Sequence, residues 1–273
     1  MQVTASQMKQ LTEGRLLRLC RDIFHPALMA LARWVLRYRI VVENDYTPLP
    51  DRPILFAGNH YCGYDITVAC NAIHGRVQIV AGKQPMFPAD EFFLKANGTI
   101  FVDRLNREDT AACKRVMAAR LRAGQNVIIF PEGTSNVSDA LPMYPMKWGI
   151  IDVAQQTGAQ IIPMILRYDK EKRRCHVRFL DPITAEGMTK QEGIRLLRDT
   201  MAAARWKDFE LGGLHSRAGL DIRAERRMNM ELLLSYKLLD YQAEQSVVFR
   251  PYPTEEEVFE PICRAYAKMM GGK

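Results

Sequence analysis

The stretch Ala-Gly-Asn-His-Tyr-Cys-Gly-Tyr-Asp-Ile at residues 57–66 decides how the rest of the chain is interpreted. It follows the apolar run Ile54–Ala57, which predicts a short buried strand. His60 and Asp65 are five residues apart, whereas neighbours on one helix face are three or four apart, so a contact between them requires a turn. Gly63 favours such a turn. A strand, a turn and a helix beginning near Asp65 are therefore predicted.

This stretch alone leaves two interpretations open. Catalytic groups are often held where a strand ends and a helix begins. A His beside an Asn at a strand end is also common as a hydrogen-bonded turn with no catalytic role. The motif is a hypothesis that other parts of the sequence must support.

Apolar strand-like runs alternate with helical patterns through most of the chain. This alternation predicts an α/β fold with a mostly parallel central sheet of about six strands flanked by helices. The expected strands are Ile54–Ala57, Val77–Ala81, Thr99–Val102, Val127–Phe130, Ile161–Leu166 and His176–Leu180. The expected helices are Asp65–Ile73, Pro85–Ala96, Arg107–Ala123, Trp148–Gln156 and Thr189–Ala204.

The N-terminal segment is helical in pattern, basic and rich in leucine. Of a net charge of +7, residues 1–40 hold seven basic side chains against two acidic ones. Residues 15–39 follow a helical period that Pro26 should kink or divide. Their longest charge-free apolar stretch is far shorter than the roughly 20 residues that a spanning helix needs. No cleavage site follows it, so a signal peptide is not expected.

Two interpretations of this helix remain open. Arginines, a Trp and leucines fit an amphipathic helix in the membrane interface, and an ordinary helix packed on the domain has a similar pattern. We take residues 1–47 as an amphipathic membrane-association segment and residues 48–204 as the main domain. A loop is expected at Asp208–Leu220, within a C-terminal helical extension, 205–273, that packs on the same domain.

The cysteines and histidines do not form a recognisable metal or disulfide pattern. Six cysteines are scattered without CxxC pairs, mostly in apolar segments, which indicates free buried thiols and a reducing compartment. The five histidines are equally dispersed. No metal site is predicted.

Four stretches at predicted strand ends are expected to converge, because ligands of open α/β sheets bind beyond the carboxyl ends of the strands. They are Asn59–Asp65, Gly98–Arg104 (Gly-Thr-Ile-Phe-Val-Asp-Arg), Phe130–Asn136 (Phe-Pro-Glu-Gly-Thr-Ser-Asn) and Ile161–Ile165. In this order, over roughly residues 50–185, the set resembles the 1-acylglycerol-3-phosphate acyltransferase family. That family combines a His and, after four intervening residues, an Asp with Phe-Val-x-Arg, Phe-Pro-Glu-Gly-Thr and a Pro-containing apolar block.

The resemblance implies an O-acyltransferase in which His60 is the general base and Asp65 orients it. Such enzymes move a fatty acyl group from acyl-CoA or acyl carrier protein to a lysolipid hydroxyl, with no cofactor. An imidazole suits this task, since an alcohol is a poor nucleophile until a base takes its proton. The acceptor alcohol is expected to attack the thioester directly.

The resemblance also implies an acceptor site. Its residues are Arg104, Glu132, Gly133, Thr134 and Ser135. Lys83, at the end of a predicted strand, and Lys147, before a predicted helix, are further candidates for contacts with anionic substrate, and the alternative for each is an ordinary surface lysine. The alternative for Arg104 is a salt bridge with Asp103 or Glu132. Members acting on lysophosphatidic acid carry Arg where this chain has Ser135. Acylation of lysophosphatidic acid to phosphatidic acid is the leading reaction. The alternative acceptors are lyso-ornithine lipid and lysophosphatidylcholine.

An apolar slot for the acyl chain is expected where Phe87, Phe92, Phe93 and Leu94 meet the N-terminal helix. The protein is then expected to be peripheral or monotopic at the cytoplasmic face of a membrane, with phospholipid, lysolipid and the acyl donor as partners. A catalytically silent lipid-binding module is the alternative. Nucleic acid is not an expected partner, because no recognised binding motif accompanies the basic segment.

Overall fold

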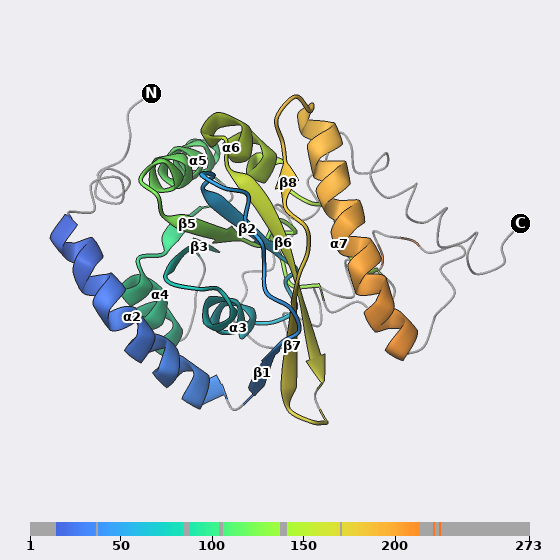
Figure 1. Ribbon diagram of the computed structural model, residues 1–273, viewed down its shortest axis with the longest axis horizontal. Coiled ribbons are helices and arrows are strands. Elements are labelled where there is room, and N and C mark those ends of the chain that lie inside the picture. Colours follow the sequence, from blue (N-terminus) through green and yellow to red (C-terminus); the bar gives the residue numbers. More distant parts are fainter. Residues whose placement is uncertain are drawn as a thin grey trace, which may run out of the picture.

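The computed structural model has a central sheet between two groups of helices (Figure 1). It describes residues 15–36, 38–83, 88–103, 106–136, 141–169 and 171–212, together with Asp221 and Ala224. The α/β fold with a mostly parallel central sheet flanked by helices is confirmed.

The sheet contains eight strands in the described part of the chain. They are β1 (Arg39–Val42), β2 (Ile54–Gly58), β3 (Val77–Gly82), β4 (Ile100–Val102), β5 (Asn126–Ile129), β6 (Gln160–Asp169), β7 (Arg174–Phe179) and β8 (Ile183–Thr184). Seven follow the order β1-β7-β6-β2-β5-β3-β4, and β8 pairs with β6. Strands β2 to β6 are parallel, β7 and β8 lie antiparallel to β6, and β1 is parallel to β7.

Helices cover both faces of the sheet. They are α2 (Arg15–Leu36), α3 (Asp65–Ala72), α4 (Pro88–Asn97), α5 (Arg107–Arg122), α6 (Gly149–Thr157) and α7 (Lys190–Gly212). One face carries α2, α3 and α4, and the other carries α5, α6 and α7 (Figure 1). Each face therefore has its own apolar core.

Strand β2 shows why its sequence is apolar without alternation. Leu55 and Ala57 face the core under α5, α6 and α7, whereas Ile54 and Phe56 face the core under α2 and α3. A parallel strand covered on both faces buries every side chain, so it reads as a continuous apolar run. β2 is accordingly buried along its whole length.

The extent of the sheet and of the last described helix differs from what the sequence predicts. The sheet has eight strands rather than about six, because β1 and the two-residue β8 join it. β1 lies within the expected N-terminal segment, so the sheet begins before residue 48. Helix α7 continues to Gly212, so residues 208–212 are helical rather than a loop. The rest of the expected C-terminal extension lies outside the described residues, apart from Asp221 and Ala224.

Helix α2 packs with one face and exposes an apolar one. His25, Met29 and Leu36 are buried against the domain. The exposed large apolar side chains of this helix are Leu16, Leu17, Leu19, Ile23, Phe24, Leu31, Trp34 and Val35, with Trp34 79% exposed. A packed helix with only a polar outer face is therefore not what the structure shows. Among the described helices none is both long and apolar enough to cross a bilayer.

Gly58, the last residue of β2, provides a test of the packing around the strand end. A Cβ atom there would lie 2.8 Å from Cε1 of Phe130, whereas one at Gly63 would meet nothing within 4 Å. Gly58→Ala should lower the free energy of unfolding by about 1–3 kcal/mol, as overpacking of a tight site does. Gly63→Ala is the matched control and should change it by less than about 1 kcal/mol. Urea unfolding followed by circular dichroism measures the unfolding free energy of each variant. Equal losses in the two variants would contradict the tight packing of Gly58 against Phe130.

Candidate active site

The candidate site lies beyond the carboxyl ends of two neighbouring strands, β2 and β5. Ala57 and Ile129 are register partners in these parallel strands. His60 and Glu132 each follow three residues later, so the sheet itself brings them together. The backbone N–H of His60 donates to Oε1 of Glu132 at 3.2 Å. Buried Asn59 fixes the same edge, because its amide donates to the carbonyl of Leu166 and accepts from the Leu166 N–H.

His60 and Asp65 contact each other directly. Nδ1 of His60 lies 2.7 Å from Oδ2 of Asp65, and the Asp65 side chain is fully buried. The same carboxylate oxygen accepts from the backbone N–H groups of Tyr61 and Cys62. The turn between the two residues does not use a left-handed glycine, because the φ of Gly63 lies outside that region. Asp65 itself organises the turn by accepting from the backbone that precedes it.

Tyr168, near the end of β6, completes the environment of Asp65. Its hydroxyl donates to Oδ1 of Asp65 at 2.6 Å. Burial, followed by the nearby Asp65 charge, raises the pKa of Tyr168, so the hydroxyl stays protonated and donates. Both oxygens of Asp65 are thus engaged. The sequence analysis did not identify Tyr168, whose only signal was its place five residues beyond Pro163 in the fourth block.

The tautomer of His60 follows from this arrangement. A carboxylate beside Nδ1 can only accept, so the proton of the neutral ring sits on Nδ1 and the lone pair on Nε2. The ring packs on Phe130, with centroids 4.9 Å apart, and the side chain is 24% exposed. Oγ of Ser135 lies 3.5 Å from Nε2. Nε2 therefore faces the hydroxyl of Ser135.

Glu132 holds the loop after β5 instead of facing outward. Its Oε2 accepts from the side-chain amide of Asn136 at 3.1 Å and from the backbone N–H of Tyr144 at 2.8 Å. The residue is buried, and this burial raises the pKa of Glu132, while the charge of Arg205 opposes the shift. The Asn136 N–H also donates to the carbonyl of His60 at 2.6 Å. Glu132 therefore holds the loop after β5 in place, and its contact with an acceptor hydroxyl stays a prediction.

The other expected site residues are Gly133, Thr134, Lys83 and Arg104, and within the described residues no side-chain hydrogen bond joins Thr134 or Lys83 to the His60–Asp65 pair. Gly133 has φ +71°, which favours glycine, and Thr134 is buried. Lys83 follows β3, two strands from β2, and its Nζ lies 3.1 Å from Oδ2 of Asp109. The contact of Lys83 with substrate stays a prediction. Arg104 lies outside the described residues.

No group of three or more His, Cys, Asp or Glu side chains that could hold a metal occurs in the described regions. The cysteines there are all free thiols: Cys70, Cys113 and Cys175 are buried, Cys62 is half-buried and Cys20 is exposed. Cys263 lies outside the described residues.

Comparisons with known proteins agree with one another. A family model described as Acyltransferase matches residues 39–167. The chain is similar to the 1-acyl-sn-glycerol-3-phosphate acyltransferase of Neisseria meningitidis serogroup B, 29% identical over 166 residues, 59% of this chain and 64% of the relative. It is also similar to the alpha enzyme of that name from Homo sapiens, 28% identical over 163 residues, 55% of this chain and 57% of the relative. The chain thus spans less than two thirds of the length of these relatives.

A solved structure shares the fold. The 1-acyl-sn-glycerophosphate (LPA) acyltransferase PlsC of Thermotoga maritima superposes with a TM-score of 0.55 at 17% identity. The match covers 77% of this chain and 89% of that one.

Burial of Glu132 makes a testable prediction for pH dependence. Its pKa is higher in the folded chain than its ordinary value of 4.5, so the folded state binds this proton more tightly than the unfolded state. Its contribution to stability is present below pH 4.5 and is lost as the pH rises through the folded pKa. Glu132→Gln cannot titrate and should lose less unfolding free energy between about pH 4.5 and 8. Denaturant unfolding across that range measures the slope.

The control is Glu186, whose carboxylate is exposed. Glu186→Gln should show the same dependence of unfolding free energy on pH as the wild type. A Glu132→Gln slope equal to or steeper than that of the wild type would contradict the prediction.

Proposed function

Residues 39–167 of the chain belong to the acyltransferase family, and on that premise we propose that the protein is a membrane-associated O-acyltransferase. It moves a fatty acyl group from a thioester donor to the hydroxyl of a lysophospholipid-type acceptor. The observation that carries this proposal is the His60–Asp65 pair, in which Nδ1 lies 2.7 Å from the Asp65 carboxylate and Nε2 carries the lone pair of a partly exposed ring.

The chemistry follows from the state of the ring. The acceptor hydroxyl gives its proton to Nε2 of His60 as its oxygen attacks the thioester carbonyl. The ring becomes an imidazolium, and the buried carboxylate of Asp65 stabilises it. His60 then protonates the departing thiolate. Asp65 is kept in place by Tyr61, Cys62 and Tyr168, so it can meet the new charge without moving.

Lysophosphatidic acid is the leading acceptor, because 1-acyl-sn-glycerol-3-phosphate acyltransferases recur among the relatives. Ser135 supplies a hydroxyl where a guanidinium would grip a phosphate bidentately. Arg104 is the remaining arginine of the motif. Lyso-ornithine lipid and lysophosphatidylcholine are the alternative acceptors, and acyl-CoA or acyl carrier protein is the donor, with no cofactor.

The apolar face of α2 supports binding to a lipid bilayer. Ile23 and Trp34 are eleven residues apart, close to three whole turns, so they share that face. Both are largely exposed, and Arg33 lies beside Trp34, where it can meet lipid phosphates. We propose that α2 lies in the interface of the cytoplasmic leaflet, with the protein bound peripherally.

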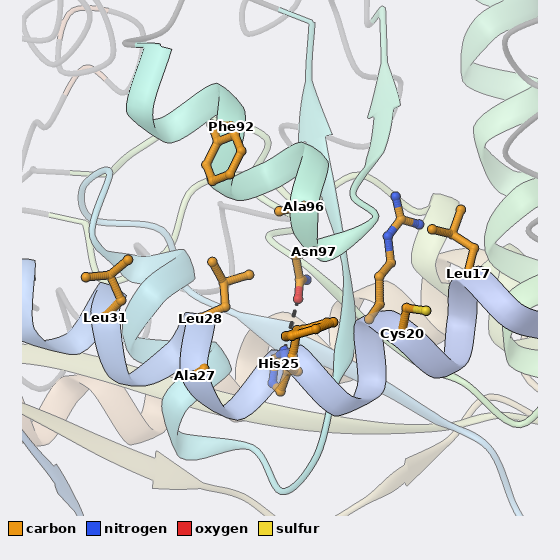
Figure 2. Close-up of a pocket in the computed structure, with 11 residues that line it drawn as sticks. Leu17, Cys20, His25, Ala27, Leu28, Leu31, Phe92, Ala96 and Asn97 are labelled. Atoms are coloured by element: carbon orange, nitrogen blue, oxygen red, sulfur yellow. Dashed lines mark hydrogen bonds between the residues drawn. The ribbon is translucent and has the colours of Figure 1, made fainter.

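A groove between α2 and α4 suits an acyl chain. It has a volume of about 550 Å³ and a mostly apolar lining, with Leu28 and Leu31 of α2 on one side and Phe92 of α4 on the other (Figure 2). His25, which lines the groove, forms a hydrogen bond with the side chain of Asn97. Burial lowers the pKa of the His25 imidazole, which favours its uncharged form. Of the aromatic cluster expected to form the slot, Phe92 lines the groove. Phe93 and Leu94 pack into the core instead, and Phe87 lies outside the described residues.

Catalysis by the pair is tested with purified protein, detergent-dispersed lysophosphatidic acid and acyl-CoA, with free thiol as the readout. His60→Ala should lower the rate of thiol release at least about 1000-fold. Asp65→Asn should cost on the order of 10⁴-fold, because an amide N–H toward Nδ1 favours the wrong tautomer. Binding to lysolipid micelles should persist in both variants.

The matched control is His74→Ala, which removes an exposed imidazole paired with Asp45. It should keep the wild-type rate. Turnover of His60→Ala at the wild-type rate would overturn the mechanism, and a wild type that binds lipid but acylates no lysolipid would favour the silent binding module.

Membrane binding is tested by placing charges on the exposed face of α2. Ile23→Glu with Trp34→Glu should reduce co-sedimentation with phosphatidylglycerol-containing vesicles by roughly 100-fold or more, since each buried large apolar side chain contributes about 1.5–3 kcal/mol. Leu196→Glu, at an exposed position of α7, places one such negative charge elsewhere and should bind like the wild type. Undiminished binding of the double variant would move the contact away from α2.

A further inference from the structure

Ser135 stands at the nitrogen of His60 that performs the chemistry. Its Oγ lies 3.5 Å from Nε2, and Nδ1 of the same ring lies 2.7 Å from Asp65. A hydroxyl within reach of a base that a third group orients is the geometric signature of an activated nucleophile. The distance is at the long end for a hydrogen bond, as such contacts often are before substrate binds.

The position of Ser135 relative to His60 is fixed by the neighbouring residues. Thr134 and Asn136, on either side of it, are both buried. The Asn136 N–H donates to the carbonyl of His60 itself, and the Asn136 side chain donates to Glu132 and to the carbonyl of Leu141. The loop that contains Ser135 is therefore hydrogen-bonded directly to the backbone of His60. The Ser135 side chain itself is half-buried.

We propose that Ser135 accepts the acyl group when no lysolipid is bound, which gives the site a second activity as an acyl-thioester hydrolase. This inference rests on the proposed function, because it uses the same donor and the same base. A bound acceptor would place its own hydroxyl at Nε2 in competition with Ser135. An empty acceptor site leaves Ser135 as the hydroxyl next to the base.

The reaction balances in two steps. First, Oγ of Ser135 attacks the thioester carbonyl while Nε2 takes its proton. The carbon–sulfur bond breaks, an acyl–serine ester forms, and the imidazolium gives the proton to the leaving thiolate. Second, a water molecule attacks the ester while Nε2 takes a proton from the water. The bond from the acyl carbon to Oγ breaks, the fatty acid leaves, and the proton returns to Oγ.

The test uses the full chain with oleoyl-CoA and no acceptor. Acid quenching within a few turnovers, followed by intact mass measurement and peptide mapping, should show one oleoyl group on the peptide that contains Ser135. Ser135→Ala should carry no such group and should lose acceptor-independent thiol release at least about 100-fold. Ser135→Cys provides a chemical signature, since its adduct would be a thioester that neutral hydroxylamine cleaves, whereas the wild-type oxygen ester resists it.

The outcomes separate this inference from the proposed function. A wild type that releases thiol with lysophosphatidic acid, but carries no adduct and hydrolyses oleoyl-CoA no faster than Ser135→Ala, overturns the hydrolase activity and leaves the acyltransferase standing. A wild type that releases no thiol with or without any acceptor overturns both. An adduct mapped to another residue also overturns the assignment to Ser135.

Discussion

The buried carboxylate of Asp65 is the group on which the rest of the site depends. An isolated buried charge is strongly unfavourable, so it needs a full set of donors around it. Here the donors are the ring of His60, two backbone N–H groups of the preceding turn and the hydroxyl of Tyr168. The same bonds that make the charge tolerable shape the turn and fix the ring. Stability and the orientation of the base therefore have a common origin.

A second set of hydrogen bonds holds the backbone of His60. Glu132 and Asn136 bond each other and the backbone of His60, so the loop after β5 is fastened to the loop after β2. This arrangement follows from the parallel pairing of the two strands, which places residues at equal distances beyond their ends side by side. Glu132 braces the loop from inside, and this leaves the half-buried Ser135 as the loop residue that meets Nε2.

The buried central strands could be predicted from the sequence, whereas the edge strands and the contacts that depend on strand order could not. Central strands are apolar because both faces are covered, which is a local signal. Edge strand β1, Arg-Ile-Val-Val, is short and only partly buried, and it begins where the helical pattern of residues 15–39 ends, so no strand was expected there. Two-residue β8 is too short to show any period. Tyr168 reaches Asp65 across 103 positions of sequence because β6 lies next to β2, and no local pattern encodes that adjacency.

Helix α2 shows why periodicity alone could not choose between a packed helix and a membrane helix. Its hydrophobic residues serve two surfaces: Met29 and Leu36 are buried against the domain, while Ile23 and Trp34 are exposed on another face. A soluble surface rarely leaves large apolar side chains gathered on one face unless something covers them. The groove between α2 and α4 opens beside this face, so a bilayer covering α2 would also offer its lipid chains to the groove. On the proposal of membrane binding, one helix would both anchor the protein and admit the acyl chain, and this would account for an apolar outer face on a helix whose inner face already packs on the domain.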